Sequence, residues 1–457
     1  MPAAKRYVLI AATLGAFLIP FMGSAINIAL PSIGDEFEME ATLLPWVSTA
    51  YLIAAAAFLV PFGKLGDIYG RKKIFTLGVV VFTLSSLMAA LSASSAMLIA
   101  SRVIQGISGA MIFGTSVAML ISVYPPGERG RVLGVNVAST YFGLSIGPFI
   151  GGILTDHFGW RSIFFVNIPL GLIVLAIVVW KLKEDWATAK GERFDLPGAI
   201  IYSLMLIAIT YGLALLPATA GICLFAIGVL AIAAFVAWEL RAKNPVLDIK
   251  LFRNNIVFAL SNVAALINYS ATFALGFLLS LYLQYIKGFT PEHAGFILVA
   301  QPVVQAIFSP IAGKLSDRFE PRVLASIGMA LCAVGLSLYI FLSDTTSIGY
   351  IIGGQVLLGF GFALFSSPNT NAVMSSVENR YYGVASATVA TMRQVGMTLS
   401  MGIAGVLFAA YIGKVQITPE YYDAFLKSVE VAFIIFSCLC VAGVFASLAR
   451  GKMRRKT

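Results

Sequence analysis

Long apolar runs make up most of the chain, and each is able to cross roughly 30 Å of hydrocarbon as a helix. Fourteen runs follow one another along the 457 residues, and hydrophobic residues are 59% of the total and charged residues 11%. A soluble protein of this length is less apolar. The pattern predicts an all-α polytopic membrane protein with spans near 7–31, 44–63, 74–92, 97–123, 133–155, 162–181, 196–216, 222–238, 256–286, 292–313, 322–343, 348–374, 382–413 and 429–449.

Basic residues gather in alternate links between these runs. If the N-terminus is cytoplasmic, 25 of the 31 Lys and Arg residues fall on the cytoplasmic side and four fall outside, while Arg102 and Arg393 lie within spans. The positive-inside rule therefore predicts a multi-pass cell-membrane protein, surrounded by lipid bilayer, with both termini in the cytoplasm. The net charge of +10 is spread over short links without a basic patch, which argues against nucleic-acid binding.

One short stretch occurs twice in the sequence. Residues 63–73 read GKLGDIYGRKK, and residues 313–319 read GKLSDRF, 250 positions later. Glycine, one acid and a basic cluster suit a tight cytoplasmic turn between two helices. A second link, 128–131, is repeated at 378–380 with the same offset. The repeat predicts a six-span bundle at 1–181, a matching bundle at 256–449, a linker with two extra spans at 182–255 and a basic tail at 450–457.

The repeated stretch resembles the signature loop of the major facilitator superfamily. Six spans, two inserted spans and six further spans resemble the fourteen-spanner drug:proton antiporters of that superfamily over nearly the whole chain. The resemblance implies two six-helix bundles that rock about a central site, with the repeated loops closing the cytoplasmic gate. Asp67 is expected to accept hydrogen bonds at the N-terminus of an opposing helix. The gate residues that it implies are Gly63, Asp67, Gly70, Arg71, Asp317 and Arg318.

Further stretches carry the same resemblance. The fifth span contains a glycine stripe that is similar to the antiporter motif of exporters, formed by Gly143, Gly147, Pro148, Gly151 and Gly152. Small-residue packing between helices is the alternative reading of this stripe. Arg102 and Gln105 resemble the Arg-x-x-Gln-Gly element of the fourth span, and residues 160–171 open the sixth span in the family's manner, with a structural role expected. A buried charge favours a functional role for Arg102, although a side chain close to the span end can also snorkel to the interface.

The first span departs from the family pattern. Residues 27–31 match the end of the family's first-helix motif, but Met22 stands where an acid is expected, and no carboxylate is predicted near the membrane midplane. Arg393, followed by Gln394, lies deep in the thirteenth span and is expected to face a wet cavity, or else to pair with backbone carbonyls. Substrate-binding candidates are Asn27, Tyr51, Gln105, Tyr141, Asn268, Gln301, Asn369, Arg393 and Gln394, with Asn262, Gln305 and Asn371 as further polar residues in spans.

Proton coupling without a central acid requires other groups. The candidates nearest the outer mouth are Asp156, His157, Glu292 and His293, with Arg102 as a charge that biases a neighbouring site. The sequence contains two histidines and no Walker-type phosphate loop, and its four cysteines lie in apolar runs without ligand spacing. These features favour neither an enzyme nor a metal or cofactor site.

The sequence therefore predicts a monomeric secondary active transporter that exports drugs or toxic small molecules by alternating access, coupled to protons. Uptake or facilitated diffusion of a neutral or anionic metabolite is the alternative within transport, motivated by the missing acid and by Arg393. A membrane sensor or scaffold without transport is the alternative from another class. The longest loops are too short for a soluble domain, which disfavours the scaffold.

Overall fold

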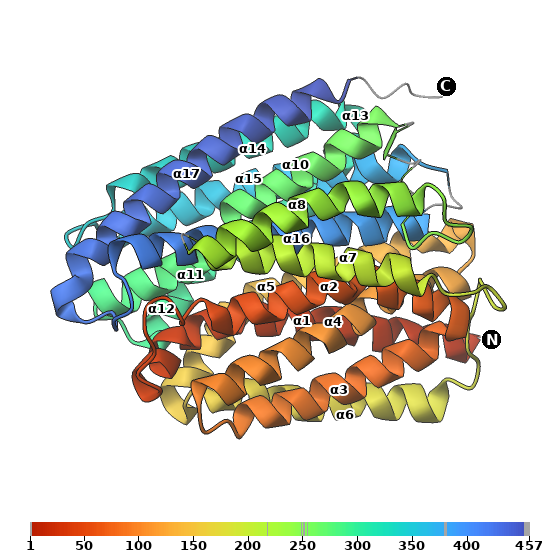
Figure 1. Cartoon of the computed structure of the whole chain (residues 1–457), viewed down its shortest axis with the longest axis horizontal. Helices are drawn as coiled ribbons and strands as arrows, with labels where there is room; N and C mark the ends of the chain where they lie inside the picture. The colour runs from red at the N-terminus through yellow and green to blue at the C-terminus, as the bar shows by residue number, and fades with distance from the viewer. Residues whose placement is uncertain are drawn as a thin grey trace.

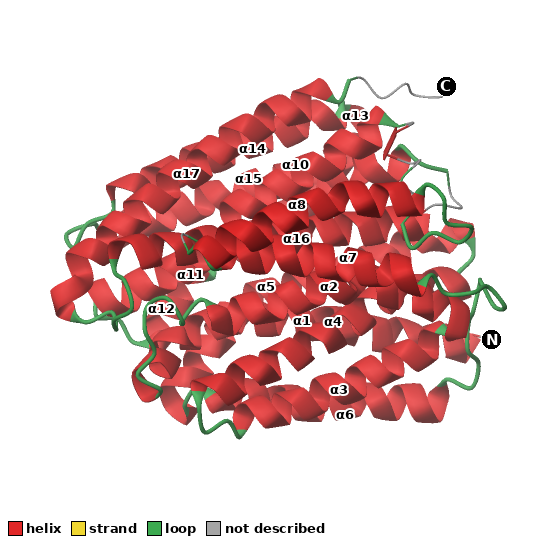
Figure 2. Ribbon diagram, viewed as in Figure 1, coloured by secondary structure: helices red, strands yellow, loops and turns green. Residues whose placement is uncertain are grey.

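The computed structural model describes residues 2–216, 218–247, 249, 252–253, 255–378 and 382–451. These residues form helices and short connections, without a strand among them (Figure 2). Fourteen helical segments are long and apolar enough to cross a membrane. Large apolar side chains such as Trp180, Leu230 and Phe445 are exposed on the outside of the bundle. The structure confirms the predicted all-α membrane fold with fourteen spans.

The first six helices form one half of the molecule. They are α1 (Pro2–Glu36), α2 (Trp46–Tyr69), α3 (Arg71–Ala90), α4 (Ser95–Val123), α5 (Pro126–Phe158) and α6 (Arg161–Lys181). In this half α1 packs on α5, α2 on α4, and α3 on both α4 and α6. Apolar side chains cannot drive helix association in lipid as they do in water, so close packing at small residues is needed.

The last six spans form the second half. They are α10 (Ile256–Thr272) with α11 (Ala274–Leu281) and a π-helix (Tyr282–Ile286), α12 (Pro291–Leu298) with α13 (Ala300–Arg318), α14 (Pro321–Leu338), α15 (Ile348–Ser375), α16 (Tyr382–Tyr411) and α17 (Tyr422–Ala449). Here α10 packs on α16, α13 on α15, and α14 on both α15 and α17. Each pairing repeats one of the first half, as the 250-residue repeat predicts.

Two further helices, α7 (Leu196–Ala214) and α8 (Thr219–Glu239), form a hairpin between the halves in sequence. They cross the front of the molecule where the two halves meet (Figure 1). α7 packs on α2 of the first half and on α16 of the second. Ser203 Oγ donates a hydrogen bond to the Ala57 carbonyl of α2 over 2.8 Å. The hairpin therefore covers the seam between α2 and α16 from outside.

The two ends of the bundle differ in charge. α1 begins and α17 ends at the same end, which also carries Lys64 and Arg71 and is named the basic end here (right in Figure 1). The opposite end, named the far end, carries Glu36, Asp156 and Glu292.

The repeated stretch is more helical than the sequence suggests. Residues 63–73 were expected to form a loop, but α2 continues to Tyr69 and α3 begins at Arg71. Only Gly70 separates the two helices, with φ of 118°. A Cβ atom at Gly70 would lie 2.2 Å from Asp185 Oδ2, so backbone conformation and space both require glycine. The second copy, 313–318, likewise belongs to the end of α13.

Candidate functional site

A cavity of about 250 Å³ lies between the two halves. Helices α1, α2, α4 and α5 line it from the first half, and α10 to α13, α15 and α16 line it from the second. Its lining is mainly apolar and includes Leu52, Phe113, Phe273, Phe362 and Met397. The lining residues include none from α7 or α8 and no Asp or Glu, within the part of the chain that the structure describes. Arg102 and Arg393 are its two arginines.

Arg102 is held tightly within the first half. Its side chain is 1% exposed, and its Nε donates to the Val47 carbonyl over 2.9 Å. Its Nη1 donates to Gln105 Oε1, and Gln105 Nε2 donates to Ser86 Oγ over 2.8 Å. The guanidinium also lies 4.6 Å from the centre of the Tyr51 ring. These contacts join α2, α3 and α4 at the cavity wall, and they engage two of the three guanidinium nitrogens.

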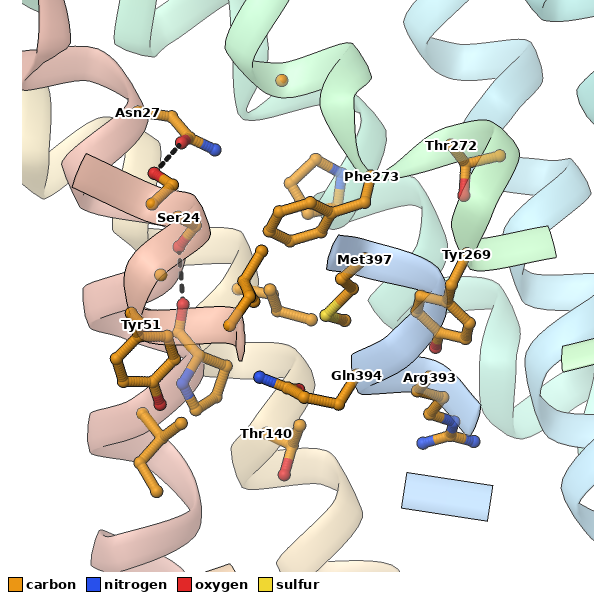
Figure 3. Close-up of a pocket in the computed structure, with 18 of the residues that line it drawn as sticks. Ser24, Asn27, Tyr51, Thr140, Tyr269, Thr272, Phe273, Arg393, Gln394 and Met397 are labelled. Atoms are coloured by element: carbon orange, nitrogen blue, oxygen red, sulfur yellow. Dashed lines mark hydrogen bonds between the residues drawn. The ribbon is translucent and has the colours of Figure 1, made fainter. Parts of the chain in front are cut away.

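Arg393 has fewer partners. Its Nη2 donates to Thr370 Oγ1 over 2.7 Å, and its guanidinium lies 5.6 Å from the centre of the Tyr269 ring. Its Nε is buried and has no hydrogen-bond partner within the part of the chain that the structure describes. Figure 3 places Arg393 beside Tyr269, while Gln394 points from the same helix toward Thr140 of the first half. A buried N–H without a partner is costly, so this nitrogen is a ready donor for a ligand.

Interruptions of two helices lie at the cavity. α10 ends at Thr272 and α11 begins at Ala274, whose N–H donates to Ser400 Oγ of α16 over 2.9 Å. α12 and α13 are separated at Val299, close to Pro302, which has no N–H to continue the helix. Phe273, Leu298 and Pro302 all line the cavity. Broken helices at a central site are a recurring feature of secondary transporters.

Several of the predicted substrate-binding candidates line the cavity: Asn27, Tyr51, Tyr141, Gln301, Arg393 and Gln394, together with Gln305. Tyr141 Oη shares a hydrogen bond with Ser366 Oγ of the second half. Gln105, Asn268 and Asn369 are not among the lining residues. Gln105 supports Arg102, and Asn369 pairs with Arg450 and with the Ser261 carbonyl. Asn262 donates to the Phe258 carbonyl and Asn371 to Ser316 Oγ, and neither lines the cavity.

The sequence pointed to the hydroxyls of Tyr51 and Tyr141, but not to the other hydroxyl groups of the lining. Ser24, Ser48, Thr140, Tyr269 and Thr272 all face the cavity. Ser48 Oγ donates to Asn27 Oδ1 over 3.3 Å, which fixes one wall. Tyr269 and Thr272 are three residues apart and share a helix face, while Asn268, one residue earlier, points away. Had Ser, Thr and Tyr been counted together with Asn and Gln, the spacing of polar residues three and four apart would have identified the helix face that carries Tyr269 and Thr272.

The far end is closed by contacts between the halves. Ser280 Oγ donates to the Asn27 carbonyl over 2.7 Å, and Gln284 Nε2 donates to the Ile28 carbonyl over 3.0 Å. α12 packs against α5, where a Cβ atom at Gly152 would lie 2.6 Å from the Pro291 carbonyl oxygen. Only glycine permits this approach of the two backbones.

The glycine stripe of α5 faces two helices. A Cβ atom at Gly143, Gly147 or Gly151 would come within 3.0 Å of α1 atoms, so these three glycines seat α5 on α1 within the first half. Gly152 faces α12 of the second half, and Pro148 lines the cavity. The stripe therefore packs helices, and its last residue reaches the contact between the halves.

The gate residues of the first copy contact the linker after α6. Asp67 Oδ1 accepts hydrogen bonds from Arg71 Nε over 2.8 Å and from Arg71 Nη2 over 2.5 Å, and also from Thr188 Oγ1 over 3.4 Å. Arg71 Nη1 reaches the Ala118 carbonyl of α4 over 2.9 Å. The expected partner of Asp67 was an opposing helix N-terminus, whereas the partners present are a neighbouring arginine and the linker.

The remaining gate residues are less constrained. A Cβ atom at Gly63 would meet only the Gly114 carbonyl oxygen at 3.7 Å. Arg318 of the second copy is exposed. The side chain of Asp317 lies outside the described part of the structure.

Four of the five coupling candidates lie at the far end. Asp156 and His157 end α5, and His157 Nε2 lies 3.1 Å from Glu292 Oε2 at the start of α12. His293 points elsewhere, because its Nδ1 shares a hydrogen bond with Thr290 Oγ1 over 3.0 Å. Arg102 belongs to the cavity wall instead. Of the five coupling candidates, the fold therefore brings Asp156, His157 and Glu292 together. It separates His293 and Arg102 from these three.

Two repeated helical halves around a central cavity define a membrane transporter. The family model of the Major Facilitator Superfamily matches residues 12–260 and 261–456, and the chain belongs to this superfamily. It is therefore a multi-pass membrane transporter of small molecules, not an enzyme.

Known proteins resemble the chain over most of its length. The riboflavin transporter RibZ of Clostridioides difficile (strain 630) is 28% identical over 451 residues, which cover 97% of each chain. The multidrug resistance protein Stp of Mycobacterium tuberculosis (strain CDC 1551 / Oshkosh) is 32% identical over 410 residues, 88% of this chain and 76% of that protein. Among solved structures, an inward-facing, unoccupied bacterial homolog of the human lysosomal transporter Spinster matches with a TM-score of 0.68 at 16% identity, covering 98% and 97% of the two chains.

Proposed function

We propose that this transporter exports amphipathic small molecules that carry an aromatic or other apolar body and an anionic or hydrogen-bond-accepting group. The observation that carries the proposal is the buried Arg393 Nε without a partner in a cavity whose lining includes no carboxylate in the described residues. A charge-assisted hydrogen bond from this guanidinium to a carboxylate or carbonyl oxygen would be stronger than one between neutral groups. The apolar lining would hold the body of the substrate.

The direction of transport rests on three observations. The basic end carries most Lys and Arg residues, so we place it and both termini in the cytoplasm. The far end is closed by contacts of α5 with α12, which leaves the cytoplasmic side for loading. The similarity to Stp and the glycine stripe of α5 support export rather than import. We further propose a monomer in the plasma membrane, driven by a proton gradient.

Uptake or facilitated diffusion of a neutral or anionic metabolite is a second candidate. The similarity to RibZ, a riboflavin transporter, over 97% of the chain favours it. The same cavity would serve either direction, because alternating access about a central site is reversible. The two candidates differ in the substrate, in the direction of net movement and in the gradient that drives it.

Matched pairs of aromatic compounds test the substrate class. Each pair shares one ring system and differs in a carboxylate or an ammonium group, and binding to the purified protein is followed by thermal shift. The anionic member is expected to stabilise the protein at lower concentration. Tighter binding of the cationic members across the pairs would contradict the proposal.

Proteoliposomes with imposed gradients test direction and coupling. Compounds that bind are expected to move out of the compartment that contacts the basic end, faster when the opposite compartment is acidic. Net movement in the other direction under the same gradient would favour uptake. A compound that stabilises the protein and is never moved would support a sensor.

A further inference from the structure

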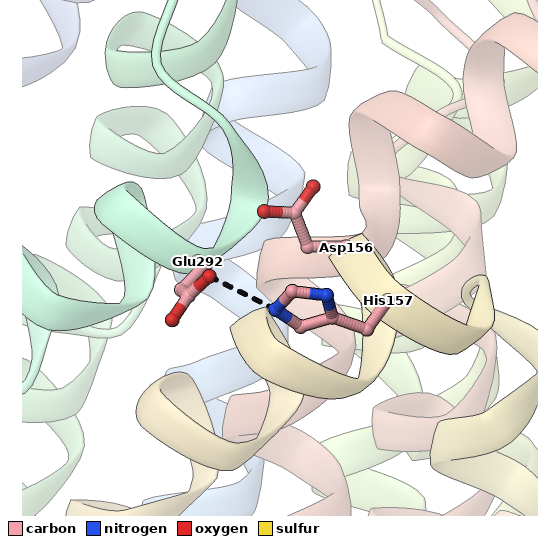
Figure 4. Close-up of side chains that lie close together, drawn as sticks. All are labelled: Asp156, His157 and Glu292. Atoms are coloured by element: carbon pink, nitrogen blue, oxygen red, sulfur yellow. Dashed lines mark hydrogen bonds and ion pairs between the residues drawn. The ribbon is translucent and has the colours of Figure 1, made fainter.

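Three metal-ligating side chains from both halves meet at the far end. Asp156 and His157 lie in the last turn of α5, and Glu292 lies in the first turn of α12. One ligand atom from each of the three lies within 4.8 Å of the other two. His157 Nε2 is 3.1 Å from Glu292 Oε2, and the Asp156 carboxylate lies above this pair in the view of Figure 4.

The ligand types favour a transition metal. An imidazole nitrogen and two carboxylate oxygens suit Zn²⁺, Co²⁺ or Ni²⁺, whereas Mg²⁺ and Ca²⁺ prefer oxygen ligands alone. Zinc–ligand bonds of about 2.0–2.1 Å place tetrahedral ligand atoms about 3.3 Å apart. The pair of His157 and Glu292 already has this spacing. The side chains of Asp156 and His157 are exposed, so small rotations can bring the third ligand atom closer.

The backbone beneath the three side chains holds them in place. A Cβ atom at Gly295 of α12 would lie 2.3 Å from the Pro148 carbonyl oxygen of α5, so glycine brings the two helices into direct backbone contact. Thr290 caps α12 by accepting from the backbone N–H of His293 over 3.4 Å. His293 Nδ1 is engaged with the same hydroxyl, which leaves His157 as the histidine that faces the contact.

We propose that Asp156, His157 and Glu292 form a site for Zn²⁺ or a similar divalent transition metal that exists only while the far end is closed. Two ligands come from the first half and one from the second. When α5 and α12 separate to open the cavity at this end, the third ligand leaves the other two. A metal that binds one conformation shifts the equilibrium toward it, so Zn²⁺ would clamp the far end shut.

Mass action gives the shift that bound Zn²⁺ would cause in the equilibrium between the closed and open forms of the far end. At a free metal concentration of 100 times the dissociation constant, the closed form gains about 100-fold over the open form. The fourth coordination position stays open to water, as in other zinc sites with three protein ligands. The clamp is independent of which substrate the cavity holds, so its test does not depend on the proposed function.

Metal binding to the purified full-length protein tests the site directly. Titration with Zn²⁺ by calorimetry, and with Co²⁺ by visible absorption, is expected to give one site per chain. His157→Ala is expected to weaken binding at least about tenfold, since second-sphere changes alone cost this much. His293→Ala is the matched control, and its affinity is expected to stay within twofold of wild type. Absence of binding, or equal losses in the two histidine variants, would overturn the site.

Cysteine labelling tests the clamp. Met397 lines the cavity, so a cysteine at this position (Met397→Cys) reports whether the cavity is open to the far side in oriented proteoliposomes. The exposed Cys223 and Cys438 are changed to Ser in the same protein, so that they do not react. A membrane-impermeant maleimide is expected to react about 100-fold more slowly at 100 times the dissociation constant of Zn²⁺, and EDTA should restore the rate. With His157→Ala added, the rate should not respond to Zn²⁺. If bound Zn²⁺ does not slow the labelling of Met397→Cys in the protein that keeps His157, the proposed clamp is wrong.

Discussion

Arg102 and Arg393 are both arginines of the cavity wall, yet their surroundings differ: Arg102 is fully buried, whereas Arg393 is partly buried. Arg102 donates to a backbone carbonyl and to Gln105, which is itself held by Ser86. Arg393 donates to Thr370, and its Nε has no partner among the described residues. Burial of a charge within the membrane is costly in both cases. The difference teaches that hydrogen-bond saturation, rather than depth in the span, separates a structural arginine from one that is free to bind substrate.

Removal of Arg102 should have the largest effect on stability. Arg102→Ala removes a hydrogen bond to the Val47 carbonyl and leaves Gln105 Oε1 without this donor, at a cost of about 1–3 kcal/mol for the buried unsatisfied Gln105 oxygen. We expect a clear fall in melting temperature in detergent and less folded protein in the membrane. Size-exclusion profiles and thermal unfolding measure both. If the Arg102→Ala protein is as stable as wild type, Arg102 is not a structural residue, and the proposed difference between Arg102 and Arg393 is wrong.

Removal of Arg393 should instead affect binding. Arg393→Ala is expected to weaken binding of an anionic substrate by about tenfold to a hundredfold, the range of a hydrogen bond to a charged group. Its melting temperature without substrate should change less than that of Arg102→Ala. The dependence of transport on a pH gradient should persist, because arginine stays protonated and cannot carry the coupled proton.

Two variants sharpen this prediction. Arg393→Lys keeps the positive charge but loses the planar guanidinium group with its several N–H donors. It should therefore bind an anionic substrate more tightly than Arg393→Ala and less tightly than wild type. Thr370→Val removes the hydrogen bond between Arg393 and Thr370 and should change affinity less than Arg393→Ala does. Retained substrate affinity with loss of coupling alone in Arg393→Ala would contradict our assignment.

A third arginine extends the comparison to the basic end. Arg71 pairs with Asp67, contacts α4 and reaches Thr188 of the linker. We propose that Asp67 acts in the gate through this cluster. Asp67→Asn should keep the protein folded at wild-type abundance but slow transport by roughly threefold to tenfold, because the two hydrogen bonds from Arg71 lose their ionised acceptor. Initial rates in proteoliposomes measure the effect, with Thr188→Val as the control for the linker contact alone. Normal transport by Asp67→Asn would exclude a gating role.

The sequence predicted the fourteen spans and the pairing of the two halves, because long apolar runs and an internal repeat are strong signals. It predicted a tight turn within residues 63–73 but not that Gly70 alone would separate the helices, since polar residues can continue a helix beyond the membrane. It also placed Arg393 in the cavity wall. It chose Asn268 over Tyr269 because the rotation of a helix about its axis is not fixed by one polar residue.

Contacts between distant segments had no local signal. Nothing in the sequence around Asp185 indicates that its carboxylate accepts a hydrogen bond from the Lys72 backbone N–H over 2.9 Å. In the same way, the sequence placed Gly152 in the glycine stripe but gave no sign that it meets α12, and Gly295 reads as an ordinary glycine until α5 and α12 are placed side by side. Both contacts depend on the tertiary fold.

The smallest effect is expected from the hairpin of α7 and α8. Ser203 lies behind α2, where its hydroxyl donates to the Ala57 carbonyl on the side away from the cavity. Ser203→Ala removes one hydrogen bond between helices, worth about 0.6 kcal/mol in a membrane protein, so the melting temperature should fall slightly. Substrate affinity should stay within twofold of wild type, because neither arginine nor any lining residue loses a partner. Tyr202→Phe, at the neighbouring position on α7, serves as a second variant of the same contact. A tenfold change in affinity in either variant would mean that the hairpin shapes the site, and the contrast between Arg102 and Arg393 would then be an incomplete account of substrate binding.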